Sequence, residues 1–325
     1  MLTEFAMPLD NTLVYDSVHS LPTRCPTLTL IGILAMPNPF LSLKALSLVG
    51  VAILGNMTPT TLIGQEVSRT KVMNSLRFHA GFDGTGDAKI AQGDGKIYTV
   101  ESMARKEWTP GITRQDVSIA KGQGKHGDCL RFGKKSPQVI CFKGEAMPYQ
   151  SKDWSGTVSF WMRLDPDKDL EPGYCDPIQI TEKAWNDAAF FVDFDKDLPR
   201  DFRLGVFSDL RFWNPENVVW EKWPVDKRPM VTVKNPGFSR EAWKHVAFTF
   251  QGINAADNQP ATSTLYLDGK SMGSLQQPLK FSWDLKKAAI LLGLEYIGDL
   301  DELMIFDRAL STDEIGILQL DPAGK

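Results

Sequence analysis

The feature that most constrains this chain is a series of short segments, from about residue 75 onward, in which apolar side chains recur at every second position. Thr157–Leu164 is one example, because Val158, Phe160 and Met162 fall on one side of an extended chain. A period of two is that of a β-strand with one buried face. Similar segments are 188–194, 202–207, 243–250, 263–269, 288–293 and 300–306. The pattern predicts an all-β fold, a two-sheet antiparallel sandwich.

One helix is predicted at the C-terminal end of the chain. The run Ser311-Thr-Asp-Glu314 is a capping box, in which the first and last side chains each accept a free backbone N–H. The helix is expected to continue through Ile315 and Leu318 and to stop near Pro322. A strong turn signal, Asp268-Gly269, predicts a tight hairpin earlier in the chain.

Composition narrows the class of protein. The chain has 325 residues, 42% of them hydrophobic, and a net charge of -4, so it is expected to be globular. A chain without an excess of positive charge lacks the field that holds a phosphate backbone. Nucleic acid is therefore excluded as the expected partner.

Residues 1–70 differ from the rest because they carry only seven charged side chains. Lys44 precedes the largely apolar run 45–54, which has the form of a secretory signal and is too short to span a bilayer. We expect a poorly structured N-terminal region with a signal peptide at about 36–64, in a chain that starts at Met36. The protein would then be secreted, periplasmic or at the cell surface, with no stable membrane span. The alternative is a genuine amphipathic or core segment at 45–54.

Cys129 and Cys141 flank a turn signal centred on residue 135. If the two flanking strands pair directly, the two cysteines lie opposite each other, near enough for a disulfide after a small adjustment. A disulfide in an oxidising compartment and two reduced, packed cysteines both remain open.

Three C-terminal motifs follow one another in order: Trp243–Phe250, Leu265–Lys270 and Gly298–Ile315. Earlier landmarks, Phe82-Asp-Gly84 and Trp154–Trp161, agree with them. Together they resemble a LamG-like jelly roll of the concanavalin A-like lectin/glucanase superfamily. The resemblance covers about 75–320 as one domain and implies a jelly-roll sandwich. The segment 165–238 departs from the short family pattern, so we expect a long insertion there.

The superfamily contains both binding modules and glycosidases, so the fold alone does not assign a function. The retaining glucanases that this chain resembles carry a Glu-x-Asp-x-Glu strand, and this sequence has no such pattern. The nearest acid pair on one strand is Asp193 and Asp195, which are also typical of solvated or turn-capping carboxylates. We expect no catalytic residue.

LamG-like sandwiches often hold a structural Ca²⁺, so the resemblance implies a calcium site. The regions that match place Asp83 and Asp301 as the first candidate ligands, with Asp87 and Glu302 after them. Calcium requires several carboxylate and carbonyl oxygens. The alternative is that these carboxylates cap turns.

The segment 209–223 is the clearest candidate for recognition. Trp213, Trp220 and Trp223 could stack against sugar rings, while Arg211 and Asn214 could reach hydroxyl groups. Large aromatic side chains also fill small cores beneath long loops, which is the alternative.

Taken together, the sequence predicts a secreted, non-catalytic LamG-like module that binds a carbohydrate or a glycosylated partner. Two alternatives remain. One is a structural or adhesion domain without a small ligand, and the other is a divergent glycan hydrolase or lyase.

Overall fold

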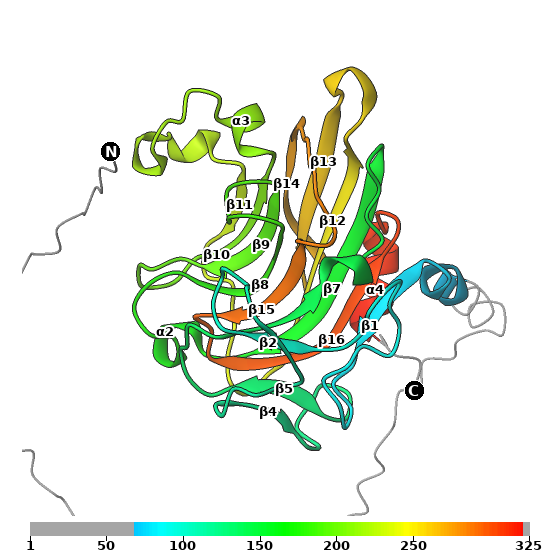
Figure 1. Cartoon of the computed structure of the whole chain (residues 1–325), viewed down its shortest axis with the longest axis vertical. Helices are drawn as coiled ribbons and strands as arrows, with labels where there is room; N and C mark the ends of the chain where they lie inside the picture. Colours follow the sequence, from blue (N-terminus) through cyan, green and yellow to red (C-terminus); the bar gives the residue numbers. More distant parts are fainter. Residues whose placement is uncertain (1–67, 321–325) are drawn as a thin grey trace, which may run out of the picture. The chain divides into compact units, whose positions relative to one another are not determined.

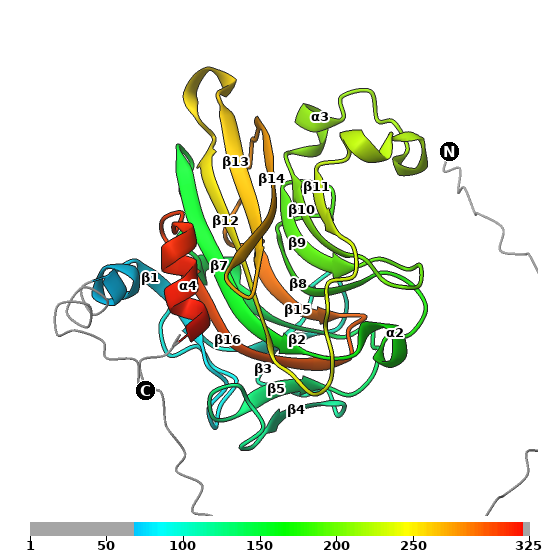
Figure 2. The same ribbon diagram turned by 180° about the vertical axis from the view of Figure 1, so that it is seen from behind.

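The structure is a computed structural model that describes residues 68–320. Two antiparallel sheets of eight strands each pack face to face, as Figures 1 and 2 show from opposite sides. This confirms the predicted all-β, two-sheet sandwich. The first sheet has the order β14 (Lys270–Pro278), β13 (Pro260–Leu267), β12 (Lys244–Ile253), β7 (Trp154–Arg163), β16 (Gly298–Phe306), β5 (Cys129–Phe132) and β4 (Val117–Ala120), with β1 (Leu76–Ala80) also pairing with β16.

The second sheet faces the first across the core and contributes its outer face to the surface. Its order is β11 (Met230–Val233), β10 (Phe202–Phe207), β9 (Ala189–Phe194), β8 (Cys175–Thr181), β15 (Ala289–Leu294), β6 (Val139–Lys143), β2 (Tyr98–Val100) and β3 (Trp108–Pro110). Helices are short: α2 (Pro166–Asp169), α3 (Leu210–Trp213), α4 (Thr312–Leu320) and the 3-10 turns η1 (Gly144–Ala146), η2 (Trp220–Lys222), η3 (Val225–Lys227) and η4 (Ala256–Asn258). Within residues 68–320, no helix has the length and apolar character that a bilayer crossing requires.

Aromatic side chains fill the space between the sheets. The ring of Phe190, from β9, stacks on Phe250 of β12 and on Phe281, with centroids 4.7 and 4.8 Å apart. Trp154 meets Phe250 edge to face at 4.6 Å, and its indole N–H donates to the Pro148 carbonyl. These rings come from both sheets, so their packing joins the two layers.

The predicted hairpin is confirmed between β13 and β14. Asp268 and Gly269 both have positive φ angles, 47° and 76°, which suits a two-residue turn of the kind that the dipeptide favours. The seven strand segments expected from periodicity are also confirmed as β7, β9, β10, β12, β13, β15 and β16, with small differences at their ends.

The predicted helix is confirmed as α4, which packs on the outer face of the first sheet (Figure 2). Its Ile315 and Leu318 lie in one buried cluster with Phe306 of β16 and Tyr266 of β13. The capping box forms in both directions. The Glu314 N–H donates to Ser311 Oγ, and the Ser311 N–H donates to a Glu314 carboxylate oxygen.

The Glu314 carboxylate also accepts two hydrogen bonds from Arg308, at 2.7 and 2.9 Å. These hydrogen bonds are the main reason why the pKa of Glu314 falls from 4.5 to about 2. The ionised form is therefore favoured by folding. Its contribution to stability is present above about pH 4.5 and is lost as the pH falls toward 2.

We predict that Glu314→Gln lowers the free energy of unfolding by about 1–2 kcal/mol at pH 7, because it removes the charge from these hydrogen bonds. Urea unfolding at pH 7 and at pH 3 measures the effect, which should shrink at the lower pH. Asp313→Asn changes an exposed acid in the same helical turn and is the control, with a smaller expected effect. An equal loss at both pH values would contradict the assignment.

The predicted pairing of Cys129 with Cys141 is wrong. The first residue lies on β5, which pairs with β4 and β16, and the second lies on β6, which pairs with β2 and β15. The chain crosses from one sheet to the other between them, so they are not opposed residues of a hairpin. Both thiols are free and buried, and burial raises the pKa of each to about 12.

The segment 165–238, expected as an insertion, supplies β8 to β11, half of the second sheet, and the loop 208–229 that carries α3, η2 and η3. The predicted signal peptide at about 36–64 lies outside the described residues.

Candidate functional site

A groove of about 820 Å³ lies on the outer face of the second sheet. Its floor follows from the strand alternation, because residues between the inward-facing core positions point outward. Phe190, Val192 and Phe194 of β9 belong to the core, so Phe191 and Asp193 face the groove. The floor consists of two rows of side chains, each formed by residues at paired positions on neighbouring strands.

The first row is charged. Arg203 of β10 lies directly opposite Asp193 of β9, and its Nε and Nη2 groups donate to the two carboxylate oxygens, the Nε contact measuring 2.9 Å. The Arg203 Nη1 atom is 3.8 Å from a carboxylate oxygen of Asp195. Asp193 is 3% exposed and Arg203 is 8% exposed. Burial raises the pKa of Asp193, and the hydrogen bonds from Arg203 oppose that rise.

Asp176 extends this row onto β8. Between Cys175 and Ile178 the ladder with β9 contains a bulge, so that Asp176 and Pro177 both fall opposite Asp193. Asp176 lines the groove and is partly exposed there. Burial, followed by the charge of Asp193, raises the pKa of Asp176 well above its ordinary value.

The second row is apolar apart from one amide. Gln179 of β8 lies opposite Phe191 of β9, and Phe191 lies opposite Gly205 of β10. A Cβ atom on Gly205 would stand 2.2 Å from the Phe191 ring, so only glycine leaves room for that ring across the strand. Gln179 is 2% exposed, and its Nε2 atom has no hydrogen-bond partner among the described residues. A buried donor of this kind is available to a ligand.

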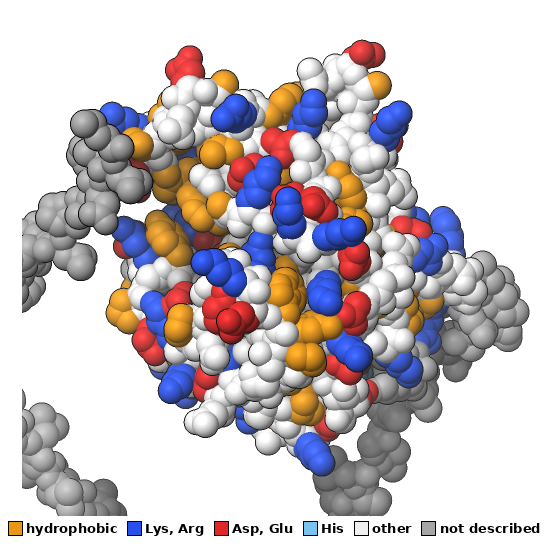
Figure 3. Space-filling model, viewed as in Figure 1, with side chains coloured by type: hydrophobic (Ala, Val, Ile, Leu, Met, Phe, Trp, Pro, Cys, Tyr) orange, Lys and Arg blue, Asp and Glu red, His pale blue; other side chains and the backbone are white. Residues whose placement is uncertain are grey.

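Aromatic side chains stand beside the floor. Trp185 and Trp220 line the groove and meet edge to face at 5.2 Å. Tyr174 lines it as well and is 46% exposed, against 36% for Trp185. Figure 3 shows hydrophobic side chains gathered among charged ones on the face that carries β9, β10 and β11. The groove thus combines aromatic surface with polar groups at its floor.

Of the five residues predicted to recognise a ligand, Trp220 alone lines the groove. Trp213 and Trp223 pack on each other at 5.2 Å, and the Trp213 indole N–H donates to the Asn186 carbonyl. The Asn214 side chain is buried. Its Nδ2 group donates to the Val218 carbonyl, and its Oδ1 atom accepts from the Val218 N–H.

Arg211 is exposed on α3 and is not among the groove residues. The structure therefore brings together one tryptophan of the predicted segment with residues that lie far from it in sequence.

Sequence reasoning did not find Tyr174, Asp176, Gln179, Trp185 or Arg203 as site residues. The usable signal was the alternation itself, because Asp193 and Arg203 are the charged members on the outward faces of two apolar strands. The bulge at Asp176 has no such signature.

Two of the predicted calcium ligands contact one loop, residues 121–128 between β4 and β5. Asp83 Oδ1 accepts from the Asp128 N–H at 2.9 Å, and Asp301 Oδ2 accepts from the His126 N–H at 3.0 Å. Cβ atoms on two loop glycines would stand 2.0 Å from Asp83 Oδ1 (Gly127) and 2.7 Å from Asp301 Oδ2 (Gly124). The loop therefore lies tightly against both carboxylates.

The other two predicted ligands are engaged elsewhere. Asp87 accepts from the Ile97 N–H at 2.9 Å, and Glu302 lies 2.6 Å from the His79 ring nitrogen Nε2. Within residues 68–320, no group of three or more His, Cys, Asp or Glu side chains could hold a metal ion. Burial raises the pKa of Asp301 to about 8. The hydrogen bond from the His126 backbone N–H acts in the opposite direction but is the smaller effect.

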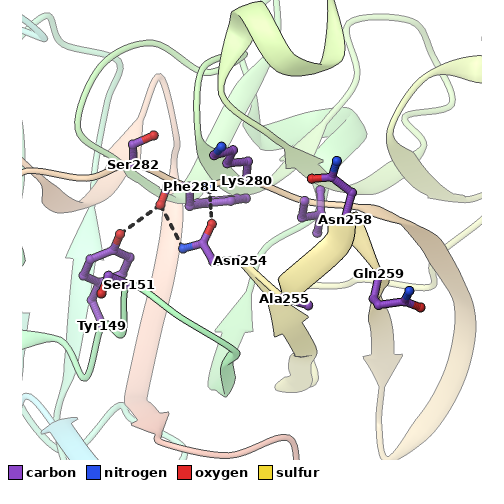
Figure 4. A pocket seen from close by; sticks show the side chains of 10 residues that line it. Tyr149, Ser151, Asn254, Ala255, Asn258, Gln259, Lys280, Phe281 and Ser282 are labelled. Carbon is purple, nitrogen blue, oxygen red and sulfur yellow. Dashed lines mark hydrogen bonds between the residues drawn. The ribbon is translucent and has the colours of Figure 1, made fainter.

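A smaller cavity of about 300 Å³ lies near the loop that follows β12. Figure 4 shows the Tyr149 hydroxyl and the Asn254 amide turned toward the Phe281 carbonyl, to which they donate at 2.8 and 3.0 Å. The Asn254 carbonyl in turn accepts from the Phe281 N–H. These polar groups hold the backbone of the cavity wall, so the groove on the second sheet is the better candidate site.

Comparison with known families agrees with this architecture. Residues 146–316, more than half of the chain, match a laminin G family model described as the concanavalin A-like lectin/glucanases superfamily. The chain belongs to this family, as the C-terminal motifs predicted. No curated protein matches the sequence.

Solved structures of similar fold include a domain of an arabinanase and the binding domain of a toxin. Domain 4 of AbnA, an extracellular GH43 arabinanase from Geobacillus stearothermophilus solved with arabinotriose, is 16% identical, covers 75% of this chain and 98% of its own, and has a TM-score of 0.46. The binding domain of botulinum neurotoxin DC, solved in a complex with SialylT, is 12% identical with a TM-score of 0.49. The match covers 77% of this chain and about half, 52%, of the toxin chain.

We predict that Arg203→Met lowers the free energy of unfolding by about 3 kcal/mol, because it leaves the buried Asp193 carboxylate without its cation. Urea unfolding at pH 7 measures the loss. The double variant Arg203→Met with Asp193→Asn should recover most of it, since the unpaired charge is then removed. A single variant within about 0.5 kcal/mol of the parent protein would contradict a tight buried pair.

Proposed function

We propose that this protein is a non-catalytic module that binds a carbohydrate or a glycosylated partner in the groove of the second sheet. The observation that carries the proposal is the composition of that groove, with Trp185, Trp220 and Tyr174 beside a floor that holds Gln179 and the Asp193–Arg203 pair. Ligand pockets of 300–1,000 Å³ with apolar walls and a few placed polar groups are typical of small-molecule sites.

Sugar rings present both an apolar face and a rim of hydroxyl groups, so such a groove is complementary to them. Aromatic side chains cover the ring faces, and the floor offers donors and acceptors for the hydroxyls. The unpartnered Gln179 amide supports this assignment, because a buried donor is costly unless a ligand or water satisfies it.

The pairing of Asp193 favours binding over hydrolysis. Glycosidases need two carboxyl groups that act as acid and as base or nucleophile. Both oxygens of Asp193 accept hydrogen bonds from Arg203, which reduces the ability of that carboxylate to attack or to remove a proton. Hydrolysis remains the second candidate, and Asp193→Asn tests it, since the substitution should abolish any turnover of a polysaccharide panel.

A location outside the cytoplasm is part of the proposal. It is supported by Lys44 and the apolar run at 45–54.

We predict that Trp220→Ala lowers the affinity for an oligosaccharide found on a glycan array by about tenfold, because it removes aromatic surface from the groove. Titration calorimetry measures the change. Trp213→Ala is the matched control: it removes a half-buried tryptophan from the same segment but outside the groove, and affinity should stay within about twofold.

Equal losses in both variants would place recognition in the 209–223 segment as a whole. If the folded protein binds no glycan on the array, the result would favour the alternative of an adhesion domain whose contacts are with protein surfaces.

Calcium is the second part of the proposal. Asp83 and Asp301 would hold the ion against the 121–128 loop. Gly124 and Gly127 have no Cβ atoms, which lets this loop approach both carboxylates. Two carboxylates are few for Ca²⁺, so backbone carbonyls and water would complete the set. Bound calcium would also favour the ionised form of Asp301, which burial disfavours.

We predict that EDTA lowers the melting temperature and that added Ca²⁺ restores it, because an ion that binds only the folded state stabilises that state. Asp301→Asn should remove the response. Asp87→Asn is the control, since this carboxylate caps the Ile97 N–H instead. A melting temperature that is unchanged by EDTA would rule out a calcium site of structural importance.

A further inference from the structure

The groove contains one acid that has no direct hydrogen bond or salt bridge to a basic side chain of the described residues. Asp176 makes no hydrogen bond or salt bridge with the side chains of the described residues, although it lies next to Asp193 at the bulge. Two basic side chains line the groove. Arg203 makes its hydrogen bonds to Asp193 and lies near Asp195, and Lys183 is 3.6 Å from Asp187. The charge of Arg203 acts on Asp176, but neither base forms a hydrogen bond or salt bridge with it.

The surroundings of Asp176 add to this imbalance. Glu221 and Glu295 also line the groove, so four acids face two bases there. A carboxylate oxygen of Glu295 lies 2.7 Å from Lys135 Nζ. Asp176 has no comparable salt bridge to a basic side chain of the described residues. Burial and the neighbouring Asp193 oppose a negative charge on Asp176 and outweigh the favourable charge of Arg203, so the pKa of Asp176 is raised. A ligand that brings its own positive charge would remove that cost.

We propose that the groove selects oligosaccharides with free amino sugars, whose ammonium group pairs with Asp176, and that it rejects acidic glycans. The inference rests on the proposed glycan-binding function and names its ligand class. The ammonium donates to the Asp176 carboxylate, while Trp185 and Trp220 cover the sugar rings. A carboxylate or sulfate on the ligand would instead face Asp176 and Asp193, while the two bases that line the groove, Arg203 and Lys183, already lie against acids of the protein.

Three oligosaccharides of equal length test the proposal: a hexamer of β-1,4-linked glucosamine, the fully N-acetylated hexamer, and a hexamer of galacturonic acid. The first two have the same backbone and differ in the charge at each nitrogen. Titration calorimetry at pH 6 and fixed ionic strength should show the glucosamine hexamer binding at least about tenfold more tightly than the N-acetylated one, as one hydrogen bond to a charged group would give. The galacturonic acid hexamer should not bind measurably.

Asp176→Asn keeps the shape of the side chain and removes its charge. It should reduce the preference for the glucosamine hexamer to less than about twofold, while the N-acetylated hexamer still binds. Asp226→Asn is the matched control, because it removes an exposed acid of the neighbouring η3 turn, outside the groove, and should preserve the preference. Thermal unfolding of both variants checks that they are folded.

The outcomes separate this inference from the function on which it rests. If the N-acetylated or the galacturonic acid hexamer binds as tightly as the glucosamine hexamer, and Trp220→Ala weakens that binding, the groove binds glycans and the assigned ligand class is overturned. A preference that survives Asp176→Asn overturns the role of that residue. If none of the three hexamers binds and a glycan array is also blank, the proposed function fails, and the inference fails with it.

Discussion

The packing of aromatic side chains between the two sheets is the interaction on which the rest of this structure depends. Phe190, Phe250, Phe281 and Trp154 lock strands from both layers together. If β9 slipped by one residue, Phe190 would turn away from these rings and the charged Asp193 would turn inward. The core therefore also determines which side chains lie on the outer face of the second sheet. The groove is formed by the strand residues that alternate with the core residues.

Much of the fold could be predicted from the sequence, since the period of two is a local property. It identified the buried face of β7 and the positions of β9, β10 and β12, and the capping box located the start of α4. The partner of each strand is a different matter. Cys129 and Cys141 both lie on predicted strands, yet the alternation carries no information about which sheet each strand joins. That choice depends on contacts between residues distant in sequence.

The site was harder to predict for the same reason. Trp220 was found because tryptophans cluster near it, but Trp213 and Trp223 have the same local signal and pack away from the groove. What distinguishes the three is the position of β8 to β10 beneath them. The pairing of Asp193 with Arg203 is visible only once the two strands are placed side by side. The clustering of aromatic residues thus indicated the region, and the topology selected the residue.

The bulge in β8 determines which chemistry the groove contains. Regular pairing continued from Ile178 and Val192 would set Asp176 opposite Phe194, with both side chains directed into the core. The additional residue reverses the faces to which the preceding side chains of β8 point. The small, apolar Cys175 therefore occupies the interior, and Asp176 reaches the surface. A single irregularity in one ladder lets the same few residues encode both a continuous sandwich core and an acidic groove.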